Sequence, residues 1–293
     1  IESVASTGGQ FMPPIMGPGA FLMAELLGIS YLDVATAALI PSTLFYIGLL
    51  FAVWLFAGKN GLQPIPSEMI PERRVAYAPR AVLVLIVPIG VLVGLVIARF
   101  TVQYAVLWAI VLALLLFVIG QLSTIREAGG MRRALAETGR GIGIMSDQAA
   151  RNVAYVGMII AAAQLVVAII NLTGLGVTLS QIIVTLGRDM LVLSLILTMV
   201  VAIMLGMGMP TPAAYAVAAA VLGPPLGRLG LELIEAHLFI YYFACLAAIT
   251  PPVAAAVFAA TAISRGRVLP TAGFAILLSL SLYLVPYLFV QDP

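Results

Sequence analysis

Groups that could bind a ligand gather at two places where paired prolines interrupt apolar sequence. The first is GGQFMPP, residues 8–14, directly after Ser6 and Thr7, and the second is AITPP, residues 248–252. Proline lacks a backbone N–H and clashes with the carbonyl group one turn earlier, so both pairs predict a break in a helix. A break leaves N–H and C=O groups without helical partners. Helix N-termini then suit carboxylates, and carbonyl groups at helix C-termini suit Na⁺.

A third candidate is GMGMPT, residues 206–211, which separates the apolar runs 190–205 and 212–222. The second run has about eleven residues and would be about 16 Å long as a helix, too short to cross about 30 Å of hydrocarbon. A re-entrant hairpin that turns inside a membrane satisfies both facts. Its tip would add hydroxyl and carbonyl oxygens to those of the two breaks.

These three segments contain no Asp or Glu, and neutral oxygens favour Na⁺ over a divalent cation, with proton coupling as the alternative. Glycine and proline can also merely kink packed membrane helices, but two paired breaks together with this tip favour a binding site. We expect no cofactor or metal apart from Na⁺ as a coupling ion. The predicted site comprises Ser6, Thr7, Gly8, Gly9, Gln10, Pro13, Pro14, Gly206, Gly208, Met209, Pro210, Thr211, Thr250, Pro251 and Pro252.

The remaining reactive side chains do not predict an enzyme. One histidine, His237, and one cysteine, Cys245, are too few for a catalytic metal centre. Serine triads, HExxH helices and phosphate-binding glycine loops are absent from the sequence. We expect His237 to cap a helix or lie at an interface, and Tyr241 and Tyr242 to pack rather than bind a ligand.

The composition is that of a helical membrane protein with several spans. Hydrophobic residues make up 63% of the chain and charged residues only 9%, against about 25% charged residues in a globular domain. The mean hydropathy is +1.16. The runs 81–98, 102–122, 153–172 and 190–205 approach or reach the length of about 20 residues that crosses a bilayer. A net charge of +2 gives no reason to expect nucleic acid as a partner.

Hydropathy and turn residues divide the predicted all-α chain into four parts, each with its own elements. Residues 1–57 hold the first broken helix and a span, and 58–122 hold a polar loop and a pair of plain helices with a tight turn at 99–101. Residues 123–189 hold an amphipathic helix (123–148), a span (153–172) and an interfacial helix (176–189). Residues 190–293 hold the hairpin, a charged connection (226–235), the second broken helix (238–264) and a last span (271–290).

Charge distribution gives this scheme an orientation. Eleven of the fourteen Lys and Arg residues fall in loops 58–80, 123–151 and 265–267, which the positive-inside rule makes cytoplasmic. The C-terminus is then outside, and the two broken helices run in opposite directions. A broken helix followed by a span therefore occurs twice with inverted topology, which is typical of secondary transporters. We expect the first repeat's hairpin upstream of Ile1, in an N-terminal part that this chain lacks.

The segments STGGQFMPPIMG (6–17), GMGMPT (206–211) and ITPPV (249–253) resemble the large membrane (permease) subunit of TRAP transporters, the tripartite ATP-independent periplasmic transporters. The resemblance covers essentially the whole chain and is strongest to the TAXI branch, in which the small and large membrane subunits are often fused. It implies an elevator fold in the inner membrane and Na⁺- or H⁺-driven symport of small organic acids. It also implies a periplasmic substrate-binding protein and a small membrane subunit, or its fused equivalent, as partners.

Two departures from the family pattern bear on these expectations. The family's first hairpin, with a Gly-Ser-Ser tip, is absent, and Met209-Pro210 stands where the dicarboxylate branch often has an acidic residue. The second departure weakens the expectation of a dicarboxylate substrate. A channel or a non-transporting membrane scaffold is the alternative function, although a channel needs a ring of polar or charged pore-lining residues and no predicted span supplies one. A membrane-embedded enzyme is disfavoured by the lack of intramembrane His, Asp or Glu clusters.

Overall fold

The computed structural model describes residues 1–63, 66, 79–123, 131–187 and 190–291, and within these residues the chain forms helices and no strand. Two compact units are present. The first unit comprises Ile1–Gly61 with Met158–Pro293, and the second comprises Leu62–Gly157. The predicted all-helical fold class is therefore confirmed, whereas the division into four parts stays a prediction.

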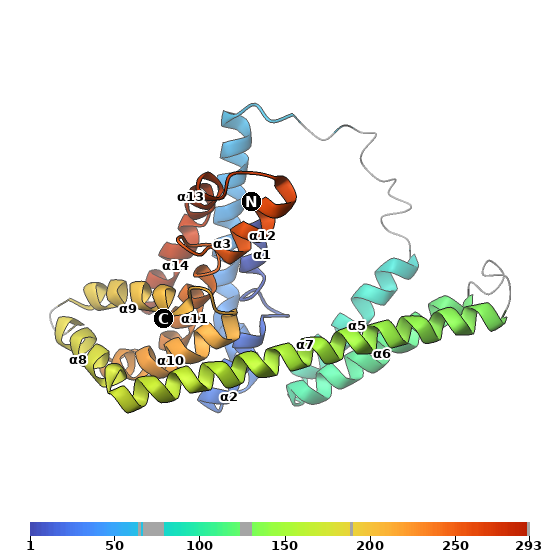
Figure 1. Cartoon of the computed structure of the whole chain (residues 1–293), viewed down its shortest axis with the longest axis horizontal. Helices are drawn as coiled ribbons and strands as arrows, with labels where there is room; N and C mark the ends of the chain where they lie inside the picture. The colour runs from blue at the N-terminus through green and yellow to red at the C-terminus, as the bar shows by residue number, and fades with distance from the viewer. Residues whose placement is uncertain (64–65, 67–78, 124–130, 188–189, 292–293) are drawn as a thin grey trace. The chain divides into compact units, whose positions relative to one another are not determined.

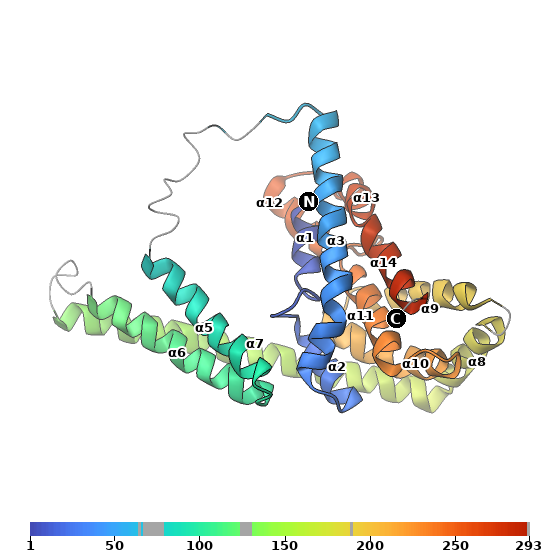
Figure 2. The same ribbon diagram turned by 180° about the vertical axis from the view of Figure 1, so that it is seen from behind.

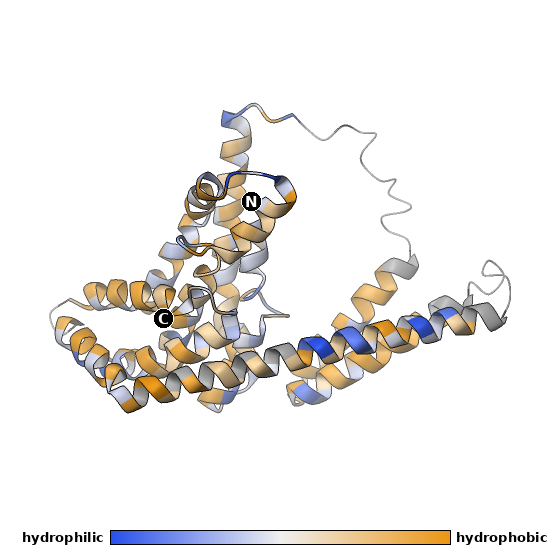
Figure 3. Cartoon of the chain, in the orientation of Figure 1, coloured by the Kyte–Doolittle hydropathy of each residue, from blue (hydrophilic) through white to orange (hydrophobic). Residues whose placement is uncertain are grey.

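The second unit contains the predicted helix pair. Helices α5 (Pro79–Ile97) and α6 (Val102–Ser123) pack against each other, and Arg99 has a φ of 62° in the tight turn between them. The same unit holds the beginning of α7 (Met131–Thr173). Figure 3 shows that hydrophilic residues gather along this part of α7, whereas α5 and α6 are mostly hydrophobic.

One continuous helix, α7, replaces the separate amphipathic helix and span that we predicted for 123–148 and 153–172. Its end at Thr173 agrees with the prediction, because Gly174 follows with a φ of 69°. No glycine or proline lies between the two predicted helices to stop the first one. Instead, Arg151 Nε donates a hydrogen bond to Asp147 Oδ2 at 2.9 Å, an i,i+4 ion pair that spans the expected boundary. Residues 124–130 of the prediction lie outside the described part.

The first unit surrounds a central helix, α11 (Leu233–Leu246), whose residues from Leu238 onward are all buried. A helix that is apolar on every side is stable only inside a core. Figures 1 and 2 show it among the other helices of the unit. These are α1 (Glu2–Gly8), α2 (Pro18–Leu27), α3 (Tyr31–Lys59), α8 (Leu175–Gly187), α9 (Leu191–Gly206), α10 (Thr211–Arg228), α12 (Ala255–Ser264), α13 (Val268–Leu278) and α14 (Leu280–Gln291).

Both predicted helix breaks are confirmed. The first separates α1, which ends at Gly8, from α2, which begins with Pro18 in its first turn. The second separates α11, which ends at Leu246, from α12, which begins at Ala255. The peptide bonds Pro13–Pro14 and Pro251–Pro252 are both cis. The first broken helix leads into α3 through a capping box in which Ser30 and Asp33 each accept the other's backbone N–H.

The second arm of the predicted hairpin is longer than expected. Helix α10 has 18 residues, from Thr211 to Arg228, so it is about 27 Å long, and the prediction of a short arm at 212–222 is wrong. Proline inside a helix costs about 3 kcal/mol, yet Pro224 and Pro225 lie within α10. Buried neighbours such as Leu222 and Leu226 pack this turn into the core and offset that cost. The length of the second arm therefore does not by itself support a re-entrant hairpin.

Three of the predicted spans are supported, whereas the apolar stretch of α5, Val82–Ile97, is shorter than a full span. Among the described residues, three helical stretches have the length and hydropathy needed to cross a membrane, namely Tyr31–Lys59, Val102–Gly120 and Val268–Val290. The last of these consists of α13 and α14, interrupted at the buried Ser279, where we predicted one unbroken span. Helix α3 leaves large apolar side chains uncovered, with Ile40, Leu50 and Trp54 exposed by 70%, 69% and 67%. Such a surface is suited to lipid rather than to water.

Candidate functional site

The first break folds back on itself around the Gln10 carbonyl group. This oxygen accepts hydrogen bonds from the Gly17 N–H at 2.6 Å and from the Tyr241 hydroxyl at 2.9 Å. The Tyr31 hydroxyl donates to the Pro14 carbonyl at 2.9 Å and accepts from the Met16 N–H at 3.0 Å. Backbone groups freed by the break are thus partly satisfied by tyrosines from α3 and α11, as buried polar groups require.

Aromatic packing fixes the position of the same break. Phe11 is completely buried and stacks on Tyr242 with ring centroids 4.4 Å apart, and it meets Phe45 of α3 edge-on at 5.5 Å. Gly8 lies so close to Phe45 that an added Cβ would be 2.3 Å from Cε1 of the ring. Helix α1 can end beside α3 in this way only because residue 8 has no side chain.

The second break is closed by its own hydrogen bonds. Thr250 Oγ1 lies 2.7 Å from the Leu246 carbonyl oxygen, to which it donates, and 2.8 Å from the Tyr283 hydroxyl of α14. The Ala256 N–H donates to the Ala248 carbonyl at 2.9 Å. Thr250 therefore ties the last turn of α11 to α14, the second helix of the last span.

The hairpin tip lies against the second break. Helix α9 ends at Gly206, and a Cβ added there would be 2.7 Å from Cβ of Ala247. Gly208 has a φ of 76° and open space around it. Met209 packs on the buried Ala213 of α10. The tip is thus built from one glycine that permits close approach and one that permits a left-handed turn.

The two breaks are joined through α11 and α12. The Ser3 hydroxyl donates to the Ala256 carbonyl at 3.2 Å, and Cys245 Sγ lies 3.9 Å from Gln10 Oε1. Together with the contact between Gly206 and Ala247, these interactions bring all three predicted segments around the last turns of α11. Several predicted members remain accessible at this place, namely Ser6, Gly9, Pro14, Gly208, Pro210 and Pro252.

Some predicted site residues make only local contacts. The Ser6 hydroxyl donates to Glu2 Oε1 at 3.0 Å, and Thr7 Oγ1 donates to the Ser3 carbonyl at 2.8 Å, both within α1. The assignment of these and the other residues to a binding site stays a prediction. Tyr31 and Tyr283 are absent from the predicted site, and the prediction for Tyr241 was packing only. The signal that was available is that a buried tyrosine hydroxyl needs a hydrogen-bond partner.

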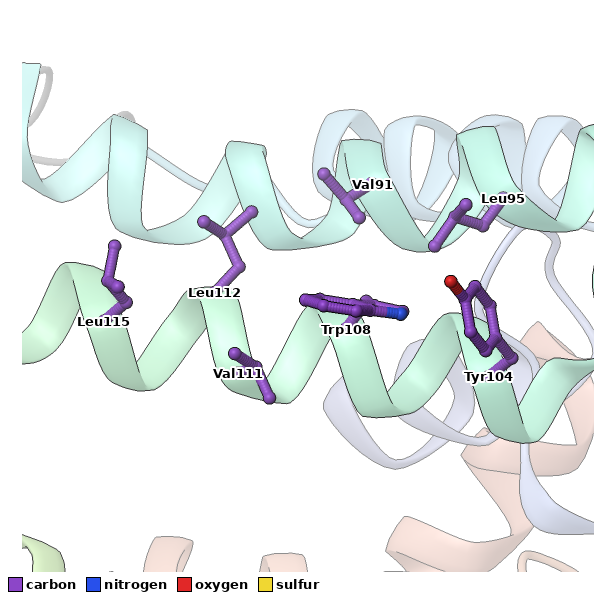
Figure 4. A pocket seen from close by; sticks show the side chains of 7 residues that line it. All are labelled: Val91, Leu95, Tyr104, Trp108, Val111, Leu112 and Leu115. Carbon is purple, nitrogen blue, oxygen red and sulfur yellow. The ribbon is translucent and has the colours of Figure 1, made fainter.

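A hollow of about 450 Å³ lies in the second unit, between α5 and α6. Figure 4 shows apolar side chains around it, with Tyr104 and Trp108 from α6 facing Val91 and Leu95 from α5. No charged residue lines it, so it does not suit an ion or an organic acid. The described residues also contain no group of three or more His, Cys, Asp or Glu side chains that could hold a metal ion.

Comparison with known families gives one match across the whole chain. The family described as "Tripartite ATP-independent periplasmic transporter, DctM component" matches residues 1–293. The matched region therefore includes both breaks and the hairpin. No curated protein matches the chain.

Proposed function

The chain belongs to the DctM component family of tripartite ATP-independent periplasmic transporters, and on this premise we propose that it imports small organic acids by symport with Na⁺ or H⁺. Membership in this family supports a multi-pass component of an inner-membrane transporter and is consistent with a protein that is not an enzyme. It also implies a periplasmic binding protein and a small membrane subunit as partners. We further propose the TAXI branch, a fused form of the two membrane subunits, and a periplasmic C-terminus.

The observation that carries the proposal is the meeting of three helix interruptions at one place. Helices α1, α9 and α11 end there, at Gly8, Gly206 and Leu246. Helix C-termini carry partial negative charge and free carbonyl groups, which suit Na⁺. Helices α2, α10 and α12 begin beside them, and helix N-termini suit the carboxylate of an organic acid. The site thus offers carbonyl groups for Na⁺ and backbone N–H groups for a carboxylate, without a charged side chain.

Helix contacts in the first unit support two repeats of inverted topology. If the first broken helix (α1, α2) corresponds to the second (α11, α12), a two-fold axis exchanges the pair α1–α12 with the pair α11–α2. Both pairs are in contact. The span that follows each broken helix also meets its counterpart, because α3 packs against α14, and Gly48 lies against Ser281 there. In many secondary transporters such repeats move against each other, so that the binding site opens alternately to the two sides of the membrane.

We propose an elevator mechanism in which the hairpin and the broken helices move as the transport body. The separate helix pair α5–α6, in a compact unit of its own, would be part of the scaffold. Its apolar composition and its lack of any candidate site residue support a structural rather than a ligand-binding role.

The test is uptake of radiolabelled organic acids by proteoliposomes that contain the complete membrane transporter. We expect uptake only when both a periplasmic binding protein and an inward Na⁺ or H⁺ gradient are present, and collapse of that gradient should stop it. Flux that persists without the binding protein and without the gradient would favour a channel and contradict the proposal.

A further inference from the structure

Two neighbouring tyrosines of the central helix have different surroundings although both are completely buried. The Tyr241 hydroxyl donates to the Gln10 carbonyl at 2.9 Å, whereas the Tyr242 hydroxyl has no hydrogen-bond partner among the residues that the structure describes. Tyr242 is held by ring contacts, with Phe11 at 4.4 Å and Phe289 at 5.9 Å. Tyr241 is therefore the one of the two that bonds to the unwound backbone of the first break.

The beginning of α2 is shaped to fit the Tyr241 ring. A Cβ added at Gly19 would lie 2.4 Å from Tyr241 Cε2, and one added at Gly17 would lie 3.1 Å from the hydroxyl oxygen. Separations below 3.0 Å do not occur for real Cβ atoms. The first turn of α2 can therefore approach α11 only because residue 19 is glycine, and a side chain at residue 17 would be tight against the Tyr241 hydroxyl.

The Tyr241 ring also contacts the hairpin. It meets the edge of Tyr215 of α10, with centroids 5.3 Å apart and planes at 79°. The Tyr215 hydroxyl is in turn 2.7 Å from His237 Nδ1 of α11. Tyr215 is completely buried, so its position is fixed by these contacts. An unbroken series of contacts thus runs from the second arm of the hairpin through α11 to the Gln10 carbonyl.

We propose that Tyr241 is a positioning residue that holds the first break in its ligand-binding shape and couples that shape to the hairpin arm. Its hydroxyl fixes the Gln10 backbone, and the Gln10 carboxamide then lies against Cys245, within two turns of Thr250. The consequence for transport rests on the proposed function. The consequence for the conformation of the break does not, so the two can fail separately.

The experiment compares Tyr241→Phe with Tyr242→Phe, since each removes one buried hydroxyl from the same helix. Hydrogen–deuterium exchange of residues 9–17 is measured on the purified protein in nanodiscs, and solute and ion half-saturation are measured in the uptake assay. We expect Tyr241→Phe to accelerate exchange and to raise the half-saturating ion concentration, each by about two- to tenfold, the range of one net hydrogen bond. The maximal rate should be largely retained, and Tyr242→Phe should change neither quantity.

Tyr215→Phe tests the link to the hairpin, because it removes the hydrogen bond to His237 but keeps the ring. We expect a smaller rise of exchange in residues 9–17 than for Tyr241→Phe, and no rise would overturn the coupling. Equal behaviour of Tyr241→Phe and Tyr242→Phe would overturn the positioning role. The positioning role would also be overturned if Tyr241→Phe accelerated exchange in residues 9–17 but left the half-saturating ion concentration unchanged. If the wild-type protein shows no coupled uptake, the proposed function fails, and the exchange data alone decide whether Tyr241 holds the break.

Discussion

Thr250 is a predicted site residue whose side chain has two hydrogen-bond partners. Its Oγ1 is within hydrogen-bond distance of both the Leu246 carbonyl and the Tyr283 hydroxyl. One hydroxyl thus stabilises the C-terminus of α11 and also fixes α14 against the break. If a cation is held by carbonyl groups at this helix end, loss of the hydroxyl changes both the stability of the fold and the geometry of the ligands.

We predict that Thr250→Val lowers the free energy of unfolding by about 1–2 kcal/mol, because two partly buried groups lose a hydrogen-bond partner. The half-saturating ion concentration in uptake should rise about fivefold or more. Thermal unfolding in detergent and the ion dependence of uptake measure the two effects. Thr250→Ser keeps the hydroxyl, so its free energy of unfolding and its half-saturating ion concentration should both stay close to the wild-type values.

Thr198→Val in α9 is the matched control for that substitution. Thr198 is completely buried, and its Oγ1 has no hydrogen-bond partner in the described part of the chain. Removal of an unpaired buried hydroxyl is neutral or stabilising. Equal loss of stability in Thr198→Val and Thr250→Val would show that the Thr250 contacts contribute nothing specific.

At the scale of the elements, the tip of the hairpin depends on close approach between α9 and the second break. We predict that Gly206→Ala destabilises the protein by about 1–3 kcal/mol and abolishes most uptake, because its methyl group would lie 2.7 Å from Cβ of Ala247. The matched substitution Gly227→Ala lies in α10 with no atom close to the added Cβ. It should leave uptake intact and raise stability slightly, since alanine favours a helix over glycine. Wild-type uptake by Gly206→Ala would remove the tip from the site.

The helix breaks could be predicted from sequence because proline acts locally, through its own missing N–H and its clash with the preceding turn. The length of the hairpin arm was predicted wrongly because the apolar run stops at residue 222, whereas α10 continues through Pro224 and Pro225 with Leu226 buried. Burial depends on neighbours distant in sequence and could not be inferred from the segment itself. The hydrogen bond from Tyr241 to Gln10 is a similar case, since it joins residues 231 positions apart.

At the scale of the whole molecule, the distribution of charge predicts the orientation, and the inverted topology of the repeat follows from that orientation. The repeat requires the two broken helices to cross the membrane in opposite directions. The distribution of Lys and Arg predicts that the loops 58–80, 123–151 and 265–267 are cytoplasmic, and this orientation gives the two broken helices those opposite directions. It also predicts that the turn at 99–101 and the loop at 265–267 lie on opposite sides of the membrane.

This topology predicts which introduced cysteines a membrane-impermeant maleimide can reach. Thr101 and Ser264 are both exposed, and the single native cysteine, Cys245, is buried, so the unaltered chain serves as the control. We expect Thr101→Cys to be labelled in intact spheroplasts and Ser264→Cys only after the membrane is permeabilised. The reverse pattern would contradict the orientation. Labelling of both from the same side would contradict the number of crossings between them, and with it the opposite directions of the two broken helices.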